Sequence, residues 1–304
     1  MKILAPDWDW SSANPSYDKI PLGSEWQPFP IETFMPKDRD TMLVTDVDCH
    51  KADKEYKKIQ DSDKVTKFLK ERKQFLEEIS KAADKNINHL DEADSLYQTM
   101  IIEARDFDYW WTKYWTKEQQ TKIMEQLKVI GDFDYETAWA SKKIQALRSG
   151  ILVEEIYNNM KHYIEGTSNN RFYEYSAHDT TVAPMLHLLG SNNNKRVPFG
   201  STVIFELHQN SQNNYFVKIY YLNETYAGNP HLLKIGICSG QTQCSYDDFH
   251  KSIKEFFVQD FDDECDNKSQ NSPGKGSSIN GKSSWFMILM LITLIKSNMF
   301  KIKI

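Results

Sequence analysis

A histidine and an aspartate stand side by side where a strand-like segment meets a helix-like one. His178 and Asp179 follow the β-rich run 171–176 and precede the apolar run VAPMLHLLG. A strand that leads directly into a helix places such residues at the carboxyl edge of a sheet, where ligands bind in open α/β folds. Free backbone N–H groups at a helix start favour anions such as phosphate. There His178 could donate hydrogen bonds to phosphate oxygens, and Asp179 could act as a general acid.

A plainer interpretation of the same pair stays open. Asp179 could only cap the helix, with His178 as a surface neighbour. His-Asp dipeptides are common, so the spacing alone favours this plainer interpretation over a catalytic one.

Composition limits the other kinds of function. The chain has 304 residues, 40% of them hydrophobic, which is enough for one large domain or two small ones. Its formal charge is -6, without the excess of basic residues that is typical of nucleic-acid-binding proteins, so a nucleic-acid partner is not expected. No pair of cysteines has the CxxC spacing, and no histidine lies at zinc-ligand distance from a cysteine. We therefore expect neither a metal site nor a cofactor.

Hydrophobic periodicity predicts an α/β core that carries a helical insertion. Residues 1–36 are rich in Pro and Trp and read as extended, and 41–45 (TMLVT) is a strand candidate. Helical patterns are predicted over 51–82, 90–104, 117–130 and 144–163, and again over 247–258. Strands are predicted at 202–207 and 215–222, joined as a hairpin by 209–214. The expected division is an extended segment and core strand (1–49), a helical cap (50–140), an α/β core (141–266), a polar linker (267–284) and a hydrophobic tail (285–304).

The cysteines and glycosylation patterns favour an oxidising compartment. The four cysteines are Cys49, Cys238, Cys244 and Cys265. Their even number favours two disulfides, and free thiols in a cytosolic protein are the alternative. Asn223 and Asn267 each begin an Asn-X-Ser/Thr pattern and are candidate glycosylation sites.

The two ends of the sequence give conflicting indications about secretion. The start, MKILAPDWDW, has no apolar core of signal-peptide length. Near the other end, residues 285–295 form an apolar run behind a Ser/Gly/Asn/Lys-rich spacer. Its length suits the tail of a lipid-anchor signal, and the lysines that follow suit a stop-transfer helix. A buried terminal helix is the third interpretation, and we expect a membrane anchor.

Several segments resemble the histidine acid phosphatases, the branch that includes prostatic and lysosomal acid phosphatases. YSAHDTTV (175–182) resembles the family's His-Asp motif, and WQPFP (26–30) is similar to its WQPxP segment. GILVEEI (150–156) resembles the helix before the His-Asp strand, and YYLNET (220–225) a strand end with a glycosylation site. The segment from Gly236 through Cys244 is similar to the family's short Cys-to-Cys loop. These landmarks follow the family order from about residue 20 to 265.

The resemblance implies a fold, a reaction and residue roles. The family has a mixed sheet with helices on both faces and an inserted helical cap. It hydrolyses phosphate monoesters without a metal, through a phosphohistidine on the motif RHGxRxP. By position, His178 would bind phosphate and Asp179 would protonate the leaving oxygen. The implied disulfides pair Cys238 with Cys244 and Cys49 with Cys265, and the implied location is an extracellular or a lysosomal or vacuolar lumenal membrane face.

The nucleophile motif is absent from these residues. No histidine is followed by glycine and none is preceded by arginine. We therefore expect an amino-terminally truncated chain that lacks the family's first, central strand and is inactive alone. Three explanations remain: a working phosphatase whose start is missing from the gene model, a cell-surface pseudophosphatase that binds a ligand or partner, and a non-functional remnant. An RHGxRxP segment encoded in frame just upstream would favour the first.

Overall fold

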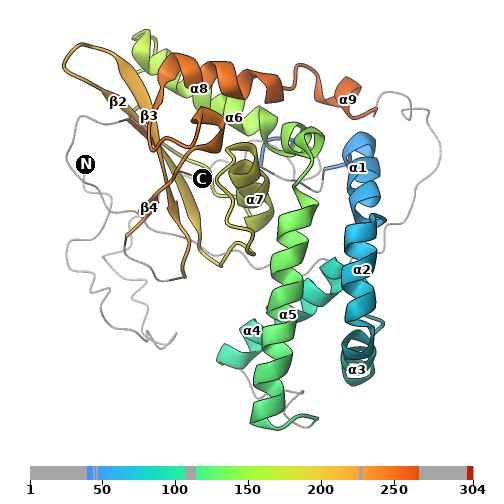
Figure 1. Cartoon of the computed structure of the whole chain (residues 1–304). Coiled ribbons are helices and arrows are strands. Elements are labelled where there is room, and N and C mark those ends of the chain that lie inside the picture. The colour runs from blue at the N-terminus through green and yellow to red at the C-terminus, as the bar shows by residue number, and fades with distance from the viewer. Residues whose placement is uncertain are drawn as a thin grey trace, which may run out of the picture.

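The computed structural model describes residues 40–43, 45, 47–106, 114–225, 229–266 and 300–303. Its first half is helical, as the periodicity predicts (Figure 1). The helices in this half are α1 (His50–Gln60), α2 (Asp63–Glu71), α3 (Lys73–Ala83), α4 (Leu90–Asp106), α5 (Lys117–Ala138) and α6 (Lys142–Ile164).

The helical cap, here α1 to α5, has a hydrophobic cluster of its own. Val65 of α2, Ile79 of α3, Leu90 and Met100 of α4 and Leu127 of α5 are all fully buried together. Helices α4 and α5 pack along one another, and α5 continues to the region of α6 and α7 (Figure 1). Helix α5 contributes Leu127 to the cluster of the cap and Tyr135 to the cluster that covers the sheet, so it connects the two.

The second half alternates strands and helices. Its elements are β1 (Phe172–Glu174), α7 (Asp179–Leu188), β2 (Thr202–Gln209), β3 (Tyr215–Leu222), β4 (His231–Leu232), β5 (Cys244–Ser245), α8 (Tyr246–Ile253), α9 (Phe261–Glu264) and β6 (Phe300–Lys303). The sheet has the order β1-β6-β2-β3-β4, with β5 beside β3. Strands β1 and β6 run parallel, and the other pairs are antiparallel.

The β2–β3 hairpin forms the centre of the second hydrophobic cluster. Alternation along β2 turns Val203, Phe205 and Leu207 to one face, where they pack with Val217 and Ile219 of β3. Residues of α6, α7 and α8 belong to the same cluster and cover this face. Helices on the second face, which the resemblance implies, stay a prediction.

Strand β6 lies in the interior of the sheet. Phe172 of β1 pairs with Lys301, and Phe205 of β2 pairs with Ile302. Residues 300–303 end the segment that was expected to be a membrane-anchor tail, and their backbone pairs with β1 and β2. The anchor itself stays a prediction. The described sheet is continuous from β1 through β6 to β2. The expected loss of the family's first, central strand stays a prediction.

The strand expected at 41–45 is wrong. Residues 41–43 and 45 form turns, and the Asp40 carboxylate accepts the backbone N–H groups of Met42 and Leu43 at 3.2 and 3.0 Å. An aspartate that binds the backbone two and three residues ahead favours a turn over a strand. This local contact overrides the apolar composition of the segment.

Two disulfides are present, with the pairing that the resemblance implies. Cys49 and Cys265, both fully buried, join the start of α1 to the end of α9 across 216 residues. Cys238 and Cys244 lie 6 positions apart in the sequence, and Cys244 begins β5. The long bridge therefore ties the first described helix to the last one.

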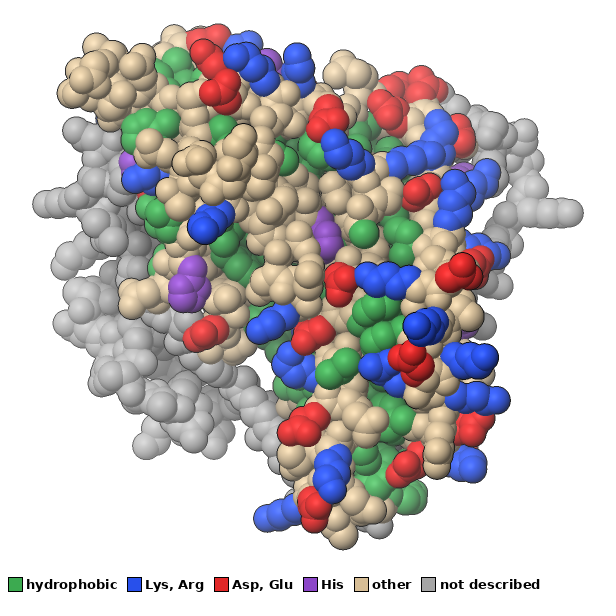
Figure 2. All heavy atoms as spheres, viewed as in Figure 1, with side chains coloured by type: hydrophobic (Ala, Val, Ile, Leu, Met, Phe, Trp, Pro, Cys, Tyr) green, Lys and Arg blue, Asp and Glu red, His purple; other side chains and the backbone are tan. Residues whose placement is uncertain are grey.

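On the face shown in Figure 2, basic and acidic side chains are interspersed over the cap, and neither sign forms a continuous patch. Among the described helices, none is long and apolar enough to cross a membrane. Residues 285–299, where the apolar run lies, are outside the described residues.

Candidate active site

The turn between β1 and α7 carries the two residues that the sequence singled out. β1 ends at Glu174, and α7 begins at Asp179 with His178 as its N-cap. Two hydrogen bonds of Thr181, which is fully buried, hold this turn. Its hydroxyl accepts the backbone N–H of His178 at 3.4 Å and donates to the carbonyl of Leu43. The predicted strand–His-Asp–helix geometry is therefore present, with His178 half-buried.

The Asp179 carboxylate is held from both of its oxygens. Oδ1 accepts the backbone N–H of Thr180 at 2.8 Å. Oδ2 accepts the hydroxyl of Tyr135 and an Nη2–H of Arg196, each at 2.9 Å. The Asp179 side chain keeps 25% of its surface exposed. It is thus fixed in direction and still open to solvent, as a group that exchanges protons with a ligand must be.

Arg196 lies between the cap and the core. Its side chain is only 7% exposed, and its Nε donates to the Asp94 carboxylate of α4 at 3.0 and 3.3 Å. Nη1 donates to the carbonyl of Val197 at 3.0 Å, and the guanidinium lies 5.3 Å from the ring centre of Tyr135. One buried cation therefore connects Asp94 of the cap to Asp179 of α7.

Burial shapes the proton affinities in this network. Burial raises the pKa of Tyr135 well above 10, and the nearby Asp179 charge acts in the same direction. The phenol thus stays protonated and donates at any physiological pH. Burial also raises the pKa of Asp94, and the positive charge of Arg196 opposes this rise.

Sequence reasoning found His178 and Asp179 and missed their partners. None of Arg196, Tyr135 and Asp94 was singled out from the sequence. They lie 17, 44 and 102 residues from their partners in this network. A charged residue beside the apolar run VPF is a weak signal, and no local pattern marks the other two.

The other predicted site residues can be placed in part. Asn223 directly follows β3, and the Thr225 hydroxyl of the same sequon donates to the carbonyl of Phe199 at 2.8 Å. Asn267 is outside the described residues. Glycosylation at both stays a prediction. Within the described ranges, no group of three or more His, Cys, Asp or Glu is arranged to hold a metal ion.

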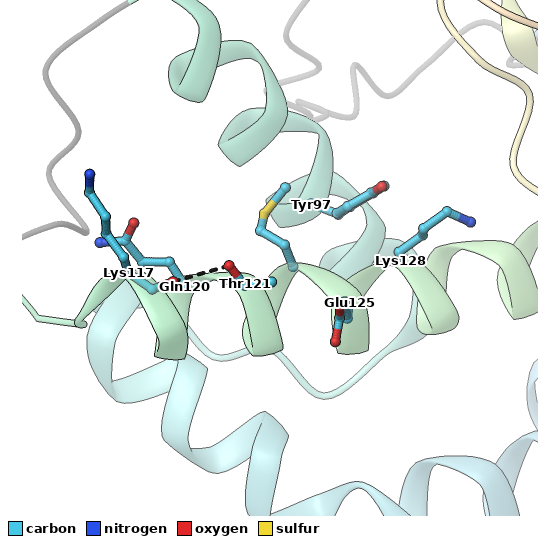
Figure 3. A pocket seen from close by; sticks show the side chains of 7 residues that line it. Tyr97, Lys117, Gln120, Thr121, Glu125 and Lys128 are labelled. Carbon is cyan, nitrogen blue, oxygen red and sulfur yellow. Dashed lines mark hydrogen bonds between the residues drawn. The ribbon is translucent and has the colours of Figure 1, made fainter.

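A surface pocket of about 490 Å³ lies elsewhere, between α4 and α5 of the cap. Figure 3 shows Tyr97 reaching towards it from α4, with Lys117 and Lys128 at its two ends on α5. Neither His178 nor Asp179 lines it. The network at Asp179 is the candidate site, since it positions a carboxylate for acid–base chemistry.

Comparisons with known proteins identify the family. The sequence profile of the histidine phosphatase superfamily (branch 2) matches residues 24–222. The chain is 26% identical to lysosomal acid phosphatase of Xenopus laevis, over 90% of this chain and 63% of the relative. It is 27% identical to prostatic acid phosphatase of Rattus norvegicus, over 79% and 62%, and 28% identical to that of Homo sapiens, over 79% and 61%. The chain thus spans about three-fifths of the length of these relatives.

Proposed function

Because the chain belongs to the histidine phosphatase superfamily (branch 2), we propose that it serves the hydrolysis of phosphate monoesters in acid. The observation that carries the proposal is the position of Asp179. It begins helix α7 at the carboxyl end of β1, directly after His178, and its carboxylate is held by Tyr135 and Arg196.

Each residue has a distinct part in the proposed reaction. His178, at the N-terminus of α7, binds the phosphate oxygens. The phosphorus–oxygen bond of the ester breaks, the phosphoryl group passes to a nucleophilic histidine, and Asp179 gives its proton to the leaving oxygen. Water then releases phosphate from the histidine. A proton donor must start as the neutral acid, so the first step is favoured at acid pH.

The nucleophile is not supplied by these 304 residues, which contain no Arg-His or His-Gly pair. The part that we assign to them is phosphate binding and proton donation. The two disulfides suit an oxidising location, and we propose the extracellular or lysosomal lumenal side.

The first experiment separates binding from hydrolysis. We expect residues 1–304 to release no phosphate from an aryl phosphate at pH 5, and to bind inorganic phosphate with an affinity that His178→Ala abolishes. His231→Ala, in an exposed histidine of β4, is the control and should bind as the parent does. Phosphate release that His178→Ala abolishes would refute the prediction that these residues lack a nucleophile. Phosphate binding unchanged by His178→Ala would refute the assignment of His178 to the phosphate site.

The second experiment tests the acid role. In a form that also carries the family's RHGxRxP segment, Asp179→Asn is expected to slow hydrolysis roughly 10²–10⁴-fold. The loss should be greatest for esters with poor leaving groups, since these need the proton most. An equal loss across leaving groups of different pKa would contradict proton donation by Asp179.

A further inference from the structure

Negative charge exceeds positive charge in the buried region between the cap and the core. Arg196 donates to Asp94 and to Asp179, and so the two carboxylates share one cation. A third carboxylate, Asp134 of α5, is 7% exposed. Among the described residues its Oδ1 has no hydrogen-bond partner. An ionised carboxylate is costly at this place, because this oxygen has lost water without gaining a donor.

The groups around Asp134 do not neutralise it. It is faced by Tyr56 and Gln60 from α1, by Asp91 and Asp94 from α4, and by Arg196. The amide nitrogen of Gln60 is also buried without a partner among the described residues. A side-chain amide can both donate and accept, so it suits a carboxylic acid as well as a carboxylate. The neighbours of Asp134 are thus two further acids and an arginine that Asp94 and Asp179 already share. Binding a proton is the simplest way to neutralise the Asp134 carboxylate.

We propose that Asp134 is a proton-dependent contact that holds α1, α4 and α5 together in acid and loosens them when it ionises. This inference goes beyond phosphate chemistry, since it concerns the stability of the cap. It also reaches the candidate site, because Asp94 of α4 shares Arg196 with Asp179.

The direction of the pH effect follows from proton binding. Burial, followed by the charges of Asp94 and Asp91, raises the pKa of Asp134 from the ordinary 3.8 to about 7, against the opposing effects of Gln60 and Arg196. Between these values the folded protein holds a proton that the unfolded chain releases. The stabilisation is therefore complete below about 3.8, declines as pH rises, and is lost above about 7.

Thermal unfolding of the whole 304-residue chain tests this contact. Relative to Asp134→Asn, which cannot ionise, the parent Tm should fall by roughly 5 °C between pH 4.5 and 7.5 and then stay constant. Glu125→Gln removes an exposed acid of the same helix and should follow the parent at every pH. Parallel curves for the parent and Asp134→Asn would overturn the proposal.

Hydrogen exchange of the parent protein gives a second test that does not depend on a variant. After correction for the intrinsic pH effect, amides of α4 and α5 should exchange faster above pH 7 than at pH 5, and those of β2 and β3 should not. Unchanged protection of α4 and α5 would also overturn the proposal. Neither measurement uses phosphate, so this inference and the proposed function fail independently.

Discussion

At the scale of single residues, the candidate site depends on how one buried arginine is used. Arg196 makes charged hydrogen bonds to Asp94 and Asp179, and Tyr135 adds a neutral donor to Asp179. The tyrosine stays protonated because its pKa is raised by burial and by the Asp179 charge. Two different donors thus fix the same oxygen, and the direction of the carboxylate does not depend on the cap alone.

Replacing Arg196 by methionine is expected to destabilise the protein strongly. The change leaves the Asp94 carboxylate, 6% exposed, buried without its cation. Removing one partner of a buried ion pair typically costs roughly 3–5 kcal/mol. Urea unfolding would measure the loss, with Arg171→Met at an exposed position as the matched control. If the two variants lose equally little, the ion pair does not stabilise the fold as described.

At the scale of elements, regular periodicity was the reliable signal. The strand expected at 215–222 coincides with β3, and the helix expected at 144–163 lies within α6 (Lys142–Ile164). The single helix expected over 51–82 is instead three, α1, α2 and α3. Ser62 begins α2 by accepting the N–H of Val65 at 3.4 Å, and such a cap competes with a continuous helix. Apolar spacing continues across this break, so periodicity alone does not reveal it.

The packing of α4 on α5 gives a prediction at this scale. A Cβ at Gly131 of α5 would lie 2.5 Å from the Asp94 Oδ1. Alanine in a helix interior normally gains about 1 kcal/mol over glycine. We expect Gly131→Ala to destabilise the protein here, because Arg196 holds the Asp94 carboxylate in place.

A double-mutant cycle isolates this contact. In an Asp94→Ala background the obstacle is gone, so Gly131→Ala should stabilise by up to about 1 kcal/mol. Denaturant unfolding of the four proteins measures the sign in each background. A stabilising Gly131→Ala in both backgrounds would show that α4 and α5 do not approach as closely as described.

At the scale of the whole molecule, the resemblance to a family supplied what spacing could not. The spacing of His178 and Asp179 alone favoured a helix cap over catalysis. His178 is the N-cap of α7, and the catalytic role of Asp179 is part of the proposal. Its partners come from α4, α5 and the segment after α7, and only the tertiary fold brings them together. Strand β6, which places 300–303 inside the sheet, was likewise beyond local reasoning, because its register depends on β1 and β2.

The two disulfides should contribute unequally to this assembly. In the chain-entropy description a bridge stabilises more when it closes a longer loop. The Cys49–Cys265 bridge spans 216 residues and the Cys238–Cys244 bridge spans 6. The expected contributions are about 5 and about 2 kcal/mol. Replacing each pair by alanines and comparing urea midpoints measures the difference.

The position of the long bridge strengthens that expectation. Cys49 and Cys265 pack with Ala52 and Leu147, so their loss also disturbs the contact between α1 and α6. Because α1 carries Tyr56 and Gln60 towards Asp134, loosening it should also weaken the pH dependence assigned to that carboxylate. The variant without the long bridge is therefore expected to show both a lower urea midpoint and a smaller Tm difference from its Asp134→Asn derivative. An unchanged pH difference would mean that α1 stays docked through its side-chain contacts alone.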